Sequence, residues 1–170
     1  MDFLKCLYLH QPAHWLTYQW QSFPLNQYKF YVMAEYHISA DWVKNIAFDA
    51  HIDEHTVRMD SRAPEGTNTG PSPKRMVLAA LIVCTGMDVV SLLNKMRVSY
   101  IKFSVEGKAP ITPEHPKTFE RVDLKYIITG SNVDRSKVEK AVMLSQERYC
   151  GVSAMIRKHC PIEWEVEIRG

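Results

Sequence analysis

Ser72-Pro-Lys-Arg-Met-Val-Leu-Ala-Ala-Leu-Ile-Val-Cys84 is the stretch that decides the fold of this 170-residue chain. Its first two residues predict a helix start, because serine is a favoured N-cap and proline suits the first helical position. From Met76 to Val83 the stretch is apolar on nearly every side, and the helix is expected to run to about Met96. A helix with that pattern is buried at the centre of a structure. The sequence therefore predicts a long, buried central helix.

The segments around this helix predict the rest of the fold. Alternation of apolar and polar residues indicates strands, and apolar residues three and four apart indicate helices. The expected elements are a strand hairpin over 44–52 and 55–59, strands over 98–105, 119–128 and 161–168, and helices over 134–149 and 150–158. The order β-β-α-β-β-α-α-β predicts the α+β class, with a largely antiparallel sheet packed on the helices.

The first part of the chain differs from the remainder. Residues 1–42 are rich in aromatic and amide side chains and show little periodicity, whereas the pattern sharpens from Val43. One interpretation is an arm that packs on the body or on a second subunit, since aromatic residues at this density are rarely left in water. Another is that part of it is non-native upstream sequence, with Met33 as the true start. We divide the chain into an arm of unknown role, 1–42, and one domain, 43–170.

Composition narrows the classes of function. A net charge of +2 gives no indication of a nucleic acid or an anionic membrane as partner. No apolar run approaches the roughly 20 residues of a membrane span, and the N-terminus does not resemble a signal peptide. Four cysteines without a C-x-x-C spacing are typical of a reduced, cytoplasmic protein. Seven scattered histidines form no zinc signature, so the sequence predicts neither a metal nor another cofactor.

Two cysteines are the candidates for chemistry. Cys84 lies in the apolar helix, where a cysteine is most often a small packing residue. Cys150 opens a second helical stretch, whose free N–H groups and positive dipole end favour a thiolate. Only the fold can bring these two residues together, since 66 positions (150 − 84) separate them. If the fold brings the two sulfurs together, Cys84 and Cys150 are candidates for a redox pair; if it does not, they are packing residues. Cys6 and Cys160 have no sequence context that supports a chemical role.

A reactive Cys84 also needs a nearby cation, because burial in apolar surroundings raises the pKa of a thiol. Arg62, Lys74 and Arg75 are the basic residues just upstream. Lys74 lies ten residues before Cys84, roughly 15 Å along a helix, so it can reach only the copy in a second subunit. Arg62 precedes the helix in a loop and is free to fold back or across. A solvated first helical turn is the alternative interpretation of Lys74 and Arg75.

Three stretches together resemble the OsmC/Ohr family, and most closely its YhfA-like branch. They are Gly70-Pro-Ser-Pro73 leading into Cys84-Thr-Gly-Met-Asp-Val-Val-Ser-Leu-Leu93, then Gly130 and Val133-Asp134 leading into Lys140-Ala-Val-Met-Leu-Ser-Gln-Glu-Arg-Tyr-Cys150, and finally Val152-Ser-Ala-Met155. The resemblance covers about residues 43–168. It implies the α+β fold of that family, with long central helices buried in an intertwined homodimer and active sites shared between subunits.

The resemblance also implies an activity, that of a thiol peroxidase acting on organic hydroperoxides in an antioxidant or stress response. By position Cys84 resembles the peroxidatic cysteine and Cys150 the resolving one, and Arg62 approximately matches the arginine that stabilises the thiolate. An external dithiol, often a lipoyl group in this family, would reduce the disulfide. We expect Lys74, Arg75, Met87 and Tyr149 to contact substrate, in an apolar pocket that favours alkyl or lipid peroxides.

One departure from the family pattern leaves the activity open. Characterised members carry a glutamate just after the Ser-Pro or Asn-Pro of the helix start, where it holds the arginine against the thiolate. Here Lys74 and Arg75 occupy that region. The alternatives to a peroxidase are a non-catalytic or redox-sensing protein that binds a small ligand in the interfacial pocket, and a structural partner protein that uses the aromatic arm.

Overall fold

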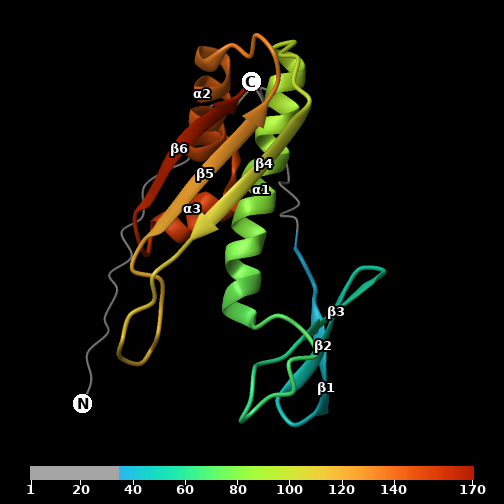
Figure 1. Ribbon diagram of the computed structural model, residues 1–170. Coiled ribbons are helices and arrows are strands. Elements are labelled where there is room, and N and C mark those ends of the chain that lie inside the picture. Colours follow the sequence, from blue (N-terminus) through green and yellow to red (C-terminus); the bar gives the residue numbers. More distant parts are fainter. Residues whose placement is uncertain (1–34) are drawn as a thin grey trace, which may run out of the picture. The chain divides into compact units, whose positions relative to one another are not determined.

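The N-terminal sheet has one strand more than predicted. The computed structural model describes residues 35–170, so most of the predicted arm lies outside the described residues. Strands β1 (Ser39–Lys44), β2 (Ala47–Ile52) and β3 (His55–Met59) form an antiparallel sheet in that order (Figure 1). The predicted hairpin is β2 and β3, and β1 was missed because all six of its side chains are exposed, so it lacks an alternating pattern.

Helix α1 (Pro73–Lys95) is the predicted central helix, with Ser72 as N-cap and proline at its start. Only one of its faces is fully buried in this chain, at Leu81, Thr85, Val89 and Leu93. By length and composition alone α1 is apolar enough to cross a membrane, a test that the core helix of a globular domain also passes. Its buried face packs into the hydrophobic core of the chain.

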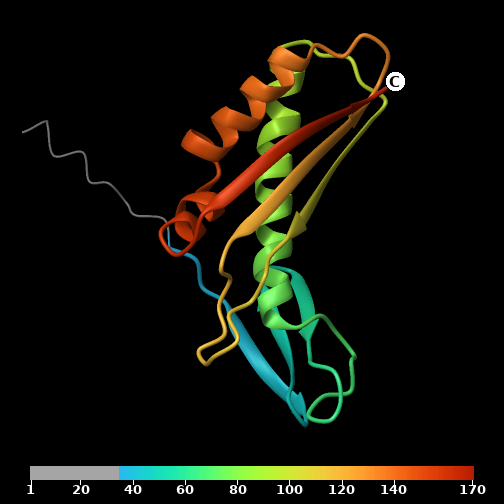
Figure 2. The same ribbon diagram turned by 60° about the vertical axis from the view of Figure 1, so that its left-hand side comes forward.

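The second sheet contains β4 (Lys102–Lys108), β5 (Val122–Thr129) and β6 (Ile162–Arg169) in that order. β4 pairs antiparallel with β5, and β5 pairs parallel with β6. The crossover between β5 and β6 contains α2 (Arg135–Leu144), a π-helical turn η1 (Ser145–Tyr149) and α3 (Gly151–Arg157). These helices and α1 lie on one face of the sheet (Figures 1 and 2).

Strand β4 begins four residues later than predicted and extends through Gly107. Arg97, just after α1, has a positive φ of 54°, and the chain turns there before it enters the sheet. The predicted strand start at Val98 is therefore wrong. Gly107 lies in the strand opposite Leu124 of β5, and a Cβ at this position would lie 2.8 Å from Cδ1 of Ile82 on α1. The missing side chain lets the helix pack closely on the sheet.

The hydrophobic core lies between α1, the second sheet and the crossover helices. Its fully or nearly fully buried side chains include Leu81, Val89, Leu93, Val122, Leu124, Tyr126, Ile128, Val138 and Val142. Of the described residues, none from β1–β3 belongs to this core. The fold is the predicted α+β class, with three of its four strand pairings antiparallel.

Candidate active site

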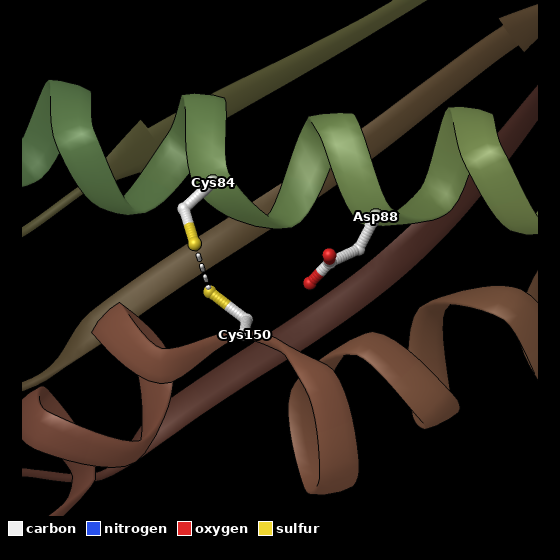
Figure 3. A group of neighbouring side chains, drawn as sticks. All are labelled: Cys84, Asp88 and Cys150. Carbon is white, nitrogen blue, oxygen red and sulfur yellow. Dashed lines mark hydrogen bonds between the residues drawn. The ribbon is translucent and has the colours of Figure 1, made fainter. Parts of the chain in front are cut away.

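The fold brings the two predicted cysteines together. The Cys150 thiol donates toward the Cys84 sulfur across 3.1 Å, and both are free thiols (Figure 3). Cys84 projects from the middle of α1 and is partly exposed, whereas Cys150 is buried. A sulfur–sulfur contact of this length needs only a small adjustment to reach the roughly 2.05 Å of a disulfide bond. The pair is therefore placed for reversible oxidation.

Cys150 is held at the start of α3, as predicted. It is the N-cap residue of that helix, and its sulfur accepts the backbone N–H of Ser153 at 3.3 Å. Its own N–H bonds the Ser145 carbonyl at 2.9 Å, across the π-helical turn η1. The predicted continuous helix to Tyr149 thus ends in a π turn. Such turns recur at functional sites, where they redirect the side chains that follow.

Asp88 is a third group at this site, and the sequence analysis did not single it out. It follows Cys84 by four residues on α1, so both side chains lie on one face of the helix (Figure 3). One carboxylate oxygen accepts the Ser145 hydroxyl at 3.0 Å. Ligand atoms of Cys84, Cys150 and Asp88 all lie within 4.8 Å of one another. The i, i+4 spacing was the available signal, once Cys84 was a candidate.

A buried chain of hydrogen bonds supports the site from behind. Thr85 shares its hydroxyl with Tyr126 at 2.7 Å and with Ser145 at 2.8 Å. The Gln146 amide donates to the Thr85 hydroxyl at 3.0 Å and to that of Tyr126 at 2.8 Å, and it accepts from Arg157. These contacts join α1, β5 and η1 directly beneath the cysteines. They fix the turn that carries Cys150 against the helix that carries Cys84.

The described surroundings favour a protonated Cys84. Burial raises the pKa of the Cys84 thiol, and the hydrogen bond from Cys150 raises it further. Hydrogen bonding from the Val152 backbone opposes this shift, while the negative charge of Asp88 adds to it. Burial likewise raises the pKa of the Tyr126 hydroxyl to about 12, so the network beneath the site stays neutral at physiological pH.

The three predicted cations lie elsewhere in the described chain. Arg62 is exposed in the loop before α1, where it and Arg75 line a hollow of about 350 Å³. The Lys74 ammonium donates to the Lys117 carbonyl at 3.2 Å. Within residues 35–170 no hydrogen bond joins any of the three to Cys84. Charge stabilisation of the thiolate by one of them stays a prediction.

Met87 and Tyr149, the other predicted contacts, are exposed to solvent at 69% and 52%. Arg148 places its guanidinium 5.9 Å from the centre of the Tyr149 ring. A separate hollow of about 310 Å³, mainly apolar, is lined by Lys74, Val77, Lys117, Thr118, Phe119, Met155, Ile156 and His159. An apolar pocket is thus present between α1 and α3, but neither Met87 nor Tyr149 lines it.

Comparison with known proteins gives concordant matches. The model of the OsmC-like protein family matches residues 66–165. Protein YhfA of Escherichia coli K12 is 33% identical over 128 residues, which cover 75% of this chain and 93% of YhfA. A hypothetical protein from Aquifex aeolicus is 26% identical, with a TM-score of 0.71 over 81% of this chain and all of that one. The organic hydroperoxide resistance protein OhrB of Bacillus subtilis shares the fold at 15% identity, with a TM-score of 0.56 over 79% and 98% of the two chains.

Proposed function

This chain belongs to the OsmC-like protein family, and on that premise we propose that it is a cysteine-based peroxidase that reduces organic hydroperoxides. The observation that carries the proposal is the 3.1 Å contact between the sulfurs of Cys84 and Cys150. The name of the B. subtilis relative, an organic hydroperoxide resistance protein, supports the choice of substrate class.

The reaction runs in three balanced steps. The Cys84 thiolate attacks the outer oxygen of the hydroperoxide, the O–O bond breaks, and a proton completes the alcohol while Cys84 becomes a sulfenic acid. The Cys150 thiol then displaces the sulfenic hydroxyl as water, which forms the Cys84–Cys150 disulfide. An external dithiol returns two electrons and two protons, leaving two thiols and its own disulfide. We infer that a lipoyl group is that dithiol, as the family resemblance implies.

The roles of the two cysteines follow from their surroundings. Cys84 is the partly exposed member of the pair, so a peroxide reaches it first. Cys150 is buried at a helix N-cap, and its sulfur lies against Cys84 without rearrangement of the helices. A resolving cysteine placed in this way traps the sulfenic acid before a second peroxide oxidises it further.

We also propose that the working form is a homodimer in the cytoplasm. The outward face of α1 exposes Val77, Val83 and Met87, and the N-terminal sheet exposes Trp42 and Phe48. Apolar surface of this extent favours a partner surface over water. A second copy would cover it and would bring Arg62 of the partner subunit toward Cys84, supplying the positive charge that the family pattern implies. Lys74 and Arg75 are the alternative sources of that charge.

One observation favours a second candidate function. Asp88 places a carboxylate beside the cysteine pair, where a peroxidase needs positive charge. A slow thiol pair in this setting fits a redox sensor, or a protein that binds a small ligand at the dimer interface. The two functions differ in turnover with an alkyl hydroperoxide.

The experiment is a single-turnover oxidation of the reduced full-length protein with one equivalent of an alkyl hydroperoxide. The peroxidase predicts rapid loss of two thiols per chain and a mass decrease of about two hydrogens. Cys84→Ser abolishes the reaction, and Cys150→Ser stops at a sulfenic acid. Cys160→Ala is the matched control, because Cys160 is a buried free thiol outside the pair.

Thiols that survive excess alkyl hydroperoxide for minutes would contradict the peroxidase and favour the second candidate. Equal or faster oxidation by hydrogen peroxide would contradict the preference for alkyl peroxides that the apolar hollow predicts.

A further inference from the structure

We propose that Cys84, Cys150 and Asp88 together bind one thiophilic divalent cation, with Zn²⁺ as the representative ion, when both thiols are reduced. Two sulfurs and one carboxylate oxygen within 4.8 Å of one another are a ligand set that zinc accepts in proteins. The sequence gives no sign of this site, because the two cysteines are 66 residues apart and no ligand motif joins them.

Both sides of the site lie on regular structure. Cys84 and Asp88 are one helical turn apart in the middle of α1, and Cys150 caps α3 from the opposite side (Figure 3). A tetrahedral zinc ion with bonds of about 2.3 Å to each sulfur holds those sulfurs about 3.8 Å apart. The reduced pair is 3.1 Å apart, so an increase of about 0.7 Å accommodates the ion. Rotation of the partly exposed Cys84 side chain supplies this movement.

Neighbouring groups orient the ligands. The Ser145 hydroxyl donates to the Asp88 carboxylate at 3.0 Å, and Ser145 is itself fixed by Thr85 at 2.8 Å. The Ser153 backbone N–H points at the Cys150 sulfur from 3.3 Å. Hydrogen bonds of this kind on ligating carboxylates and thiolates are a regular feature of protein metal sites.

The balance of charge also favours a cation. Two thiolates and a carboxylate carry three negative charges, and no described side chain of this chain forms an ion pair with Asp88. Binding of the ion replaces two thiol protons, so its two positive charges offset the two thiolates and the site keeps the single negative charge that Asp88 carries. Cys84 and Asp88 are both partly exposed, which leaves the fourth coordination position open to water.

Metal binding and disulfide formation exclude each other, because both use the same two sulfurs. The cation therefore reports the reduced state and shields the thiols from oxidation while it is bound. The site does not depend on peroxidase activity, since it requires only that the two thiols be reduced and adjacent.

The test is a titration of the reduced full-length protein with Co²⁺ in the absence of oxygen, followed by displacement with Zn²⁺. We expect one Co²⁺ per chain with a thiolate-to-cobalt charge-transfer band, which Zn²⁺ abolishes. Competition with a chromophoric chelator then gives the zinc affinity. Protein oxidised to the disulfide should show no band. Absence of the band from the reduced protein would overturn the proposal, whatever the outcome of the peroxide experiment.

Three variants locate the ion. Cys84→Ser abolishes the band, and because Cys84 is partly exposed this change should preserve the fold, which circular dichroism checks. Asp88→Asn lowers the zinc affinity more than about tenfold. Cys160→Ala, the matched control, leaves both unchanged. Retention of the band in Cys84→Ser, or of full affinity in a folded Asp88→Asn variant, would contradict the three-ligand site, as would its loss in Cys160→Ala.

Discussion

The two faces of α1 are both apolar, yet they differ in how far they are buried within this chain. Leu81, Val89 and Leu93 are fully buried against the second sheet and the crossover helices. On the other side, Val83 and Met87 are exposed at 57% and 69%. Since the sequence of the helix is apolar nearly all round, its pattern alone does not distinguish the two faces. Under the proposed function, the buried face packs within one chain and the exposed face is covered by a second copy.

Cys84 lies at the border of these faces. The buried side supplies Cys150 and the hydrogen-bond network, whereas the exposed side is where the proposed second copy would approach. The pairing of the sulfurs is thus a property of one chain. Under the proposed function, the cation that stabilises the Cys84 thiolate comes from the second subunit, so activation of the thiol requires the dimer.

The largest expected effect is on the buried face. Leu93→Ala should lower the free energy of unfolding by about 3–5 kcal/mol, because it removes a fully buried side chain and leaves a cavity. Val83→Ala is the comparison on the opposite face and should cost less than about 0.5 kcal/mol at concentrations where the chain is monomeric. Urea denaturation measures both. Equal costs under those conditions would mean that one chain covers both faces.

A smaller loss is expected in the network beneath the cysteines. Thr85→Val keeps the shape of the side chain but leaves the Tyr126 and Ser145 hydroxyls without one partner each. We expect the free energy of unfolding to fall by about 1–3 kcal/mol. Formation of the Cys84–Cys150 disulfide should also slow, because Ser145 begins the turn that places Cys150. Unchanged stability together with an unchanged oxidation rate would show that the network does not position the pair.

The segment before α1 offers a test of pH dependence. Backbone N–H groups of Thr69 and Ser61, with the Thr69 and Thr67 hydroxyls, hold the pKa of the Asp60 carboxyl well below its usual range. The stabilisation is therefore fully present above the unfolded pKa near 3.8 and is lost as the pH falls below that value toward the folded pKa. Asp60→Asn should lower the melting temperature at pH 7 relative to the wild type. In acid, where the wild-type carboxyl is protonated, the two melting temperatures should converge. A deficit that is independent of pH would contradict the ionised role of Asp60.

The smallest effect on the stability of the single chain, but a large one on assembly, is expected from Val83→Glu. A charge on the exposed face costs little in a monomer, whereas burial of that charge between two copies is unfavourable. Light scattering should show a dimer for the wild type and a shift toward monomer for the variant. Ser131→Glu, at an exposed loop position, is the control and should leave the mass unchanged. A monomeric wild type would contradict our account of the exposed face.

The sequence predicted the elements whose pattern is local. The start of α1 at Ser72-Pro73 followed from capping chemistry, and the helical stretch that Cys150 opens followed from its local pattern; both are confirmed. The late start of β4 was missed, because the turn at Arg97, where φ is positive, does not alter the hydrophobic periodicity of the sequence. Strand β1 was missed because its side chains are all exposed.

The candidate site was predicted only in part, for a related reason. Cys84 and Cys150 were candidates from their helical settings, and the family resemblance implied their roles, but their 3.1 Å contact depends on tertiary packing that no spacing reveals. Asp88 and the network of Thr85, Ser145 and Gln146 were not predicted, because a polar side chain on a helix does not show in the sequence which neighbour it contacts. Their role depends on which helix face meets η1, and only the fold decides that.

Peptide mapping of the oxidised protein without reduction tests the central claim most directly. After treatment with one equivalent of alkyl hydroperoxide, proteolysis and mass spectrometry should find a single cross-linked species that joins the peptides of Cys84 and Cys150. A disulfide that involves Cys160, or sulfinic acid at Cys84 with Cys150 still reduced, would contradict the assignment of these two cysteines as the reactive pair.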